Sequence, residues 1–112
     1  MAWPAFSALL EQAFRRDGWT VQRVKSEAFD FELERQGRRM LVSARRWKSA
    51  QTGLEALRAL QAAREQADVA DALLIGLGGL SDAARPFAAR HRIAVWQAAE
   101  IAQALNGMPL PR

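Results

Sequence analysis

Helical and extended hydrophobic patterns alternate along the chain, beginning with a helix. Residues 4–17 carry apolar side chains at the i, i+3, i+4 spacing of a helix that packs on one side: Phe6, Leu9, Leu10, Ala13 and Phe14. Pro4 suits the first turn of this helix, and Asp17-Gly18 ends it. Residues 19–24 then predict a strand, although an imperfect alternation leaves its inward face open.

The next segment predicts a hairpin of two half-buried strands. Its apolar residues follow a period of two: Phe29, Phe31, Leu33, Met40, Val42 and Ala44. A two-residue loop at Gln36-Gly37 predicts these opposite pairs: Arg35 and Arg38, Glu34 and Arg39, Phe31 and Val42, and Asp30 and Ser43. This register puts all the apolar side chains on one face, whereas a shift by one residue would not. Glutamine is not typical of such loops, so the loop conformation stays open.

The second half alternates helices with short apolar strands. Its expected elements are a helix over residues 51–67, a strand over 72–77, a helix from Ser81 or Asp82 to Arg90, a strand over 93–96 and a helix over 98–105. The order αβββαβαβα predicts an α/β fold in which a mixed β-sheet has helices on both faces. We expect a single domain over residues 1–112, with a proline-containing tail over 107–112.

Composition excludes several classes of protein. The 112 residues contain no cysteine, which excludes disulfides and thiolate metal sites. No apolar run approaches transmembrane length, and the first residues lack the pattern of a secretory signal. We therefore expect a cytoplasmic protein that does not bind membranes.

The positive charge is concentrated in the first half of the chain. The net charge is +4, and residues 1–60 contain eleven Lys and Arg against seven Asp and Glu, whereas residues 61–112 contain five of each. Between Arg35 and Lys48 there are six basic residues and no acidic one. A one-sided basic patch is typical of proteins that bind a polyanion such as nucleic acid, and a solvated basic surface is the alternative.

One set of polar residues on the hairpin could carry chemistry. The predicted register puts Asp30 beside Ser43 on the face opposite the apolar one, with Arg45 one pleat further along. An acid next to a cation in the middle of a sheet is a candidate active site. The alternative is an ordinary stabilising pair on a solvated face.

The motifs and their spacing resemble the Mrr-like branch of the restriction-endonuclease fold, over nearly the whole chain. The matching segments are Phe6-Ser7, Gly18-Trp19, Asp30-Phe31-Glu32-Leu33, the strand leading to Arg45-Arg46-Trp47-Lys48, Leu73-Leu74-Ile75-Gly76, Leu80-Ser81 and Ile93-Ala94-Val95-Trp96. In that family a PD-(D/E)xK-type site uses an Asp, a Gln or Glu and a Lys. The Asp and its partner oxygens hold a divalent cation, usually Mg²⁺, which activates water against a phosphodiester.

The resemblance implies a site that is incomplete in this chain. Asp30 keeps the acid, but Ser43 stands where Gln or Glu is expected and Arg45 where Lys is expected. Ser7 stands where the first helix has Glu in the family, and Glu11, one turn along, is a candidate substitute. A metal at Asp30 would need the Ala44 carbonyl and waters to complete its shell, so we expect weak or lost cleavage.

Three functions follow as hypotheses. The leading one is a DNA-associated domain that binds duplex phosphates through Arg38, Arg39, Arg46, Lys48 and Gln51. The second is an active Mg²⁺-dependent endonuclease that uses Asp30 and Arg45, helped by Glu11 or Glu32. The third is a non-catalytic module in which the alanine-rich helix contacts a second copy or a partner protein. Trp47 either stacks on DNA or, as we expect, packs in the core.

Overall fold

The computed structural model describes residues 1–108 of the chain. Its elements are α1 (Trp3–Arg16), β1 (Thr20–Arg23), β2 (Phe31–Arg35), β3 (Arg38–Ser43), α2 (Leu54–Ala67), β4 (Asp71–Ile75), α3 (Ala84–His91), β5 (Ile93–Trp96) and α4 (Ala98–Ala104). The order expected from the sequence is confirmed. The last residues of the expected C-terminal tail, 109–112, lie outside the described part. No helix within residues 1–108 is both long enough and apolar enough to cross a bilayer.

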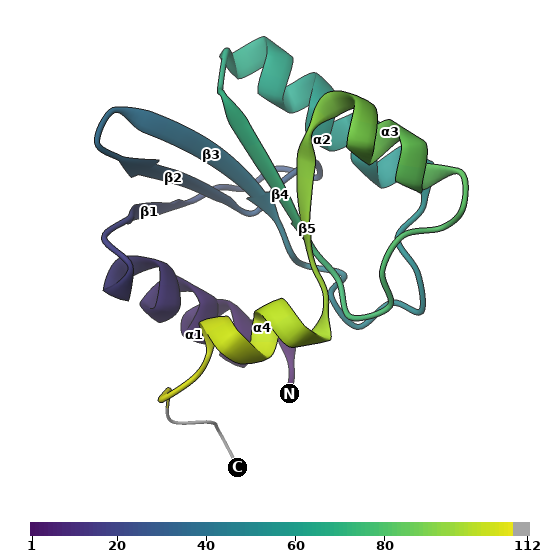
Figure 1. Ribbon diagram of the computed structural model, residues 1–112. Coiled ribbons are helices and arrows are strands. Elements are labelled where there is room, and N and C mark those ends of the chain that lie inside the picture. Colours follow the sequence, from purple (N-terminus) through teal and green to yellow (C-terminus); the bar gives the residue numbers. More distant parts are fainter. Residues whose placement is uncertain (109–112) are drawn as a thin grey trace.

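A mixed sheet of five strands organises the domain, in the order β1-β2-β3-β4-β5. The β1–β2 and β2–β3 pairs are antiparallel, whereas the β3–β4 and β4–β5 pairs are parallel. Helices α1 and α4 cover one face of the sheet, and α2 and α3 cover the other (Figure 1). Both faces are therefore covered at the centre of the sheet, as parallel crossovers require, whereas β1 is largely exposed.

The β2–β3 hairpin has the register that the sequence predicts. Phe31 pairs with Val42, and Arg35 pairs with Arg38 across the turn. Gln36 and Gly37 both have positive φ, 54° and 79°, which is the backbone geometry of a type I′ turn. Glutamine is uncommon there, so the alternation of the flanking strands fixes this turn more than the turn residues do.

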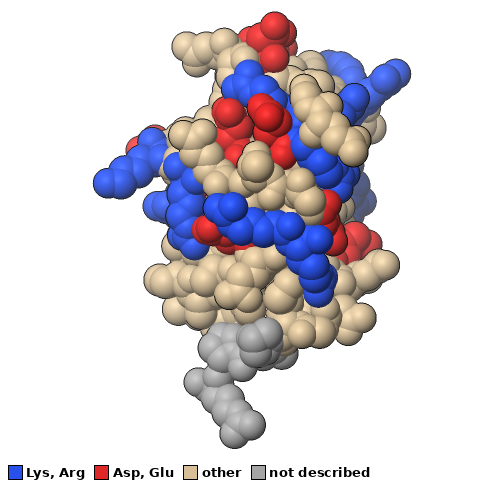
Figure 2. Space-filling view, turned by 90° about the vertical axis from the view of Figure 1, so that its left-hand side faces the viewer, with Lys and Arg blue, Asp and Glu red and all other residues tan. Residues whose placement is uncertain are grey.

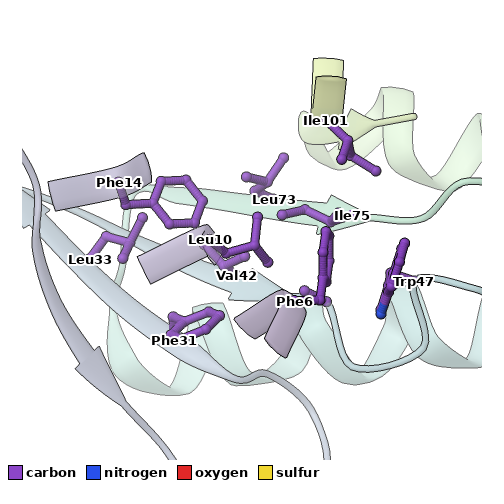
Figure 3. Close-up of a cluster of buried hydrophobic side chains, with 11 residues drawn as sticks. Phe6, Leu10, Phe14, Phe31, Leu33, Val42, Trp47, Leu73, Ile75 and Ile101 are labelled. Atoms are coloured by element: carbon purple, nitrogen blue, oxygen red, sulfur yellow. The ribbon is translucent and has the colours of Figure 1, made fainter. Parts of the chain in front are cut away.

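The core beneath α1 and α4 is rich in aromatic rings (Figure 3). Phe6 of α1 stacks on Trp47 with ring centroids 3.8 Å apart, and Phe14 stacks on Trp96 at 5.5 Å. The sheet contributes Phe31, Leu33, Val42, Leu73 and Ile75 to this cluster, and Ala44 joins it just after β3. Trp47 is 9% exposed, which confirms the expectation that this ring packs in the core.

The opposite face of the sheet has its own core. Leu41 is fully buried there beneath Leu57 and Leu60 of α2. Phe29 also packs against this second cluster, although the alternation predicted that it would share a face with Phe31. The difference arises because β2 begins at Phe31, so Phe29 lies outside the regular pleat.

The loops after β3 and β4 are joined to each other. Thr52 forms a bridge with Leu80, and the amide of Leu77 donates to the Trp47 carbonyl at 2.8 Å. This bridge explains why α2 begins at Leu54 and not at residue 51 as expected. Gly78 allows the close approach, since a Cβ atom there would lie 1.7 Å from the Ala50 carbonyl oxygen.

We therefore expect Gly78→Ala to lower the free energy of unfolding by about 2 to 3 kcal/mol, because backbone atoms must move to admit the methyl group. The melting temperature, measured by circular dichroism, should fall by roughly 10 °C. Gly53→Ala is the matched control, since its Cβ would meet nothing within 4 Å. It should cost about 0.5 kcal/mol through the weaker helix cap. Equal losses in the two variants would contradict the proposed loop contact.

Candidate functional site

The centre of the candidate site is the carboxylate of Asp30, which lies one residue before β2 and is only 6% exposed. Its Oδ2 atom accepts hydrogen bonds from the backbone amides of Ala44 at 2.7 Å and Arg45 at 2.9 Å. The backbone of Asp30 is also tied down. Its amide donates to the Val42 carbonyl at 2.7 Å, and its carbonyl accepts from the Val24 amide at 3.0 Å.

Arg45 lies against the other oxygen of this carboxylate. Its Nε atom is 3.3 Å from Asp30 Oδ1, while 64% of its side chain stays exposed. Its guanidinium carbon lies 5.7 Å from the ring centroid of Trp3, at the start of α1. The carboxylate and the indole therefore both lie against the guanidinium group of an arginine that is largely exposed.

Ser43 is the last residue of β3, where it pairs with Leu74 of β4 and is half-buried. It shares a sheet face with Leu41, which α2 covers. Arg45 does not continue this face, because β3 ends at Ser43 and the chain then turns. The structure thus brings Asp30 and Arg45 together, but it does not place Arg45 one pleat beyond Ser43 as the sequence suggested.

Both first-helix candidates, Ser7 and Glu11, are hydrogen-bonded to Arg23 of β1. Ser7 is fully buried, where its hydroxyl donates to the Pro4 carbonyl at 3.0 Å and accepts from Arg23 at 3.2 Å. Glu11 accepts from Arg23 at 2.8 Å and from Arg15 at 3.2 Å. The hydrogen bond from Arg23 is the main cause that lowers the pKa of Glu11; burial opposes it and Arg15 adds to it. Glu11 is therefore an ionised partner of two arginines, and none of its hydrogen bonds reaches Asp30.

These residues do not fit a Mg²⁺ ion, which takes an octahedral shell of oxygen ligands. Both oxygens of Asp30 already contact N–H donors, and the Ala44 carbonyl accepts the Trp47 amide at 3.1 Å. Glu32, the other acid considered, pairs with Arg39 at 3.0 Å. Within residues 1–108, no group of three or more His, Cys, Asp or Glu side chains could hold a metal ion.

The basic residues between Arg38 and Lys48 do not form one patch. Arg38 donates to both carboxylate oxygens of Asp71, at 2.5 and 2.9 Å, and Arg39 reaches Glu32 and the last carbonyl of α2. Both lie at the hairpin end of β3, whose six residues (Arg38–Ser43) span about 17 Å at an extended rise. The cations of the Asp30 end lie beyond the other end of this strand.

Residues 45–48 form a turn at that end, here called the basic turn. Arg45, Arg46 and Lys48 are exposed, while Trp47 between them is buried. Among the described residues, the only acidic group within 4.0 Å of these three cations is Asp30, against Arg45. Gln51 is exposed further along the same loop. The buried indole anchors a turn that presents its charges outward.

Arginines on the α1–β1 side of the molecule are hydrogen-bonded to acidic side chains or to backbone carbonyls. Figure 2 shows a band of Lys and Arg on this side with Asp and Glu among them. Arg15 and Arg23 share Glu11, and Arg35 donates to the Asp17 carbonyl at 2.8 Å while it covers the Trp19 ring. These side chains connect α1 to the sheet. Sequence reasoning missed Arg23, because the imperfect alternation of β1 did not reveal which side chains face α1.

Comparisons with known proteins agree with this architecture. The Mrr_cat family model, described as restriction endonuclease, matches residues 1–105. No curated protein matches the chain. The crystal structure of a protein of unknown function, AF1548, superimposes with a TM-score of 0.69 at 14% sequence identity. The match covers 89% of this chain and 65% of that protein's chain, so this chain corresponds to about two thirds of its neighbour.

The structural neighbour supports the fold alone, whereas the family model reaches across nearly every element, from α1 to the end of α4. Within the matched range, Asp30 lies just before β2 and Arg45 lies just after β3, and β4 pairs with β3. The chain belongs to the Mrr_cat family of restriction endonuclease domains.

Proposed function

We propose that this domain binds duplex DNA through its phosphates at the basic turn and cleaves it weakly or not at all. The observation that carries the proposal is the composition of the Asp30 site. Both oxygens of a single buried carboxylate contact N–H donors, and the adjoining basic turn carries three exposed cations. Family membership makes DNA the polyanion that these cations would meet.

The arrangement of cations favours contact with the phosphates of DNA over recognition of its base sequence. Phosphate contacts come from Arg and Lys side chains, and they fix the position of a protein without reporting base identity. Arg45, Arg46 and Lys48 supply such groups from one short, exposed turn. Gln51 is an exposed, uncharged side chain further along the loop, and we propose it as a secondary contact.

Loss of cleavage is supported by what surrounds Asp30. Hydrolysis of a phosphodiester by this family's chemistry requires a metal held by several oxygens and a nearby group that orients water. Here Arg45 stays charged, since a guanidinium does not lose its proton in proteins. The remaining acids considered for the site, Glu11 and Glu32, are held by arginines.

We expect binding to a duplex of about 20 base pairs that weakens steeply with salt. Three phosphate contacts correspond to a slope of log K against log salt of about −3. Fluorescence anisotropy at several salt concentrations measures this slope. Arg46→Ala and Lys48→Ala should each make the slope less negative by about one.

Arg38→Ala is the matched control for these variants, because it removes an arginine that Asp71 holds at the far end of β3. It should leave the slope unchanged. A slope that changes equally in all three variants would place the contact surface over the whole hairpin. The absence of binding at low ionic strength would overturn the proposed function.

For cleavage, we expect supercoiled plasmid to remain intact with Mg²⁺ or Mn²⁺ over hours, since the site lacks a set of metal ligands. Agarose gel electrophoresis detects nicked and linear forms. Asp30→Ala, purified in parallel, should give the same background. Nicking by the natural chain that disappears in Asp30→Ala would instead establish an active endonuclease.

A further inference from the structure

The hydrogen bonds of Asp30 lie where the β3 ladder ends. The last pair between β3 and β4 is Ser43 with Leu74, so the next two amides, of Ala44 and Arg45, lie beyond the last paired residue. Ala44 is 1% exposed, and a buried amide without an acceptor costs free energy. Asp30 Oδ2 accepts both amides. The carboxylate therefore fixes the path of the chain as it leaves the strand and enters the basic turn.

The carboxylate is itself rigidly placed. Asp30 is bonded through its backbone to Val42 of β3 and to Val24, just after β1. Three consecutive strands thus meet at this residue. A group held in this way can act as a fixed acceptor, and the turn that it holds carries Arg45 and Arg46.

We propose that Asp30 is a positioning residue for DNA binding. Its carboxylate holds the backbone at Ala44 and Arg45, so that the cations of the basic turn meet a phosphate in one arrangement. This inference rests on the proposed function. In this proposal the role of Asp30 depends on the geometry of its hydrogen bonds and not on its negative charge.

Charge and geometry predict opposite effects on affinity. A negative charge beside a phosphate-binding turn weakens the attraction, so its removal alone should tighten binding. Loss of the backbone hydrogen bonds should loosen binding, because the turn would sample other conformations. Two conservative substitutions separate these contributions, since one can keep the acceptor for the backbone amides without the charge and the other keeps the charge in a shifted position.

Asp30→Asn keeps a carbonyl oxygen that can accept both amides, while it removes the charge and puts an amide NH2 group in place of the oxygen next to Arg45 Nε. Asp30→Glu keeps the charge but moves the carboxylate by one methylene group in a buried position. Amide hydrogen exchange by NMR reports the backbone bonds of Ala44 and Arg45, and anisotropy with the same duplex reports affinity. Asp71→Ala is the matched control, because Asp71 also pairs with an arginine but lies at the other end of β3.

We expect Asp30→Glu to speed exchange at Ala44 and Arg45 by about tenfold or more, which corresponds to the loss of charge-assisted hydrogen bonds. Its affinity for DNA should fall several-fold. Asp30→Asn should keep the protection and bind DNA at least as tightly as the natural chain. Asp71→Ala should leave exchange at both amides unchanged.

The inference is overturned if Asp30→Glu keeps protection and affinity, or if Asp30→Asn loses both. Loss of protection across the whole sheet in Asp30→Glu would indicate a general loss of stability, and would also contradict a local positioning role. The affinity measurement and the amide-exchange measurement are independent of each other. If the natural chain does not bind DNA, the proposed function fails, while the exchange measurements still test the backbone contact.

Discussion

The hydrogen bonds between the Asp30 carboxylate and the amides of Ala44 and Arg45 determine how the end of the domain with the basic turn is built. An ionised carboxylate is costly to bury unless donors surround it, and here two amides and a guanidinium do so. The same contacts end β3 and start the basic turn. One residue therefore connects the edge of the hairpin to the loop that carries the exposed cations.

This arrangement differs from a metal centre in what the carboxylate is available to do. A Mg²⁺ site needs carboxylate oxygens that converge on an open position, with further oxygens around it. In this chain both oxygens of Asp30 contact N–H donors, and arginines hold Glu11 and Glu32 elsewhere. We propose that, in this nuclease-family fold, Asp30 holds the backbone while the neighbouring cations bind phosphate.

The sequence predicted the sheet well where strands are regular, because a period of two leaves only one register with a single apolar face. Phe31 opposite Val42 is an example. Prediction was poorer just outside the strands. Phe29 and Arg45 do not follow the pleat, since β2 begins at Phe31 and β3 ends at Ser43. Where a strand ends depends on contacts with distant residues, which periodicity does not describe.

The same reason explains what sequence reasoning missed in the site. Asp30 and Arg45 were expected as neighbours, and the structure places them side by side. The hydrogen bonds that Asp30 accepts from backbone amides, however, depend on where the β3 ladder ends. The separation of Arg38 and Arg39 from the basic turn follows from the length of an extended strand. The acids that pair with them, Asp71 and Glu32, come from two other strands. Basic residues that are close in sequence therefore lie at opposite ends of β3.

The most direct test of the central claim, that Asp30 holds the backbone and not a metal, is a titration of the ¹⁵N-labelled domain with Mn²⁺. A bound paramagnetic ion broadens the NMR signals of the amides around it. We expect the signals of residues 29–31 and 43–46 to lose no more intensity than those of the rest of the chain. Selective loss at these amides, abolished by Asp30→Asn, would establish a metal site and contradict the claim.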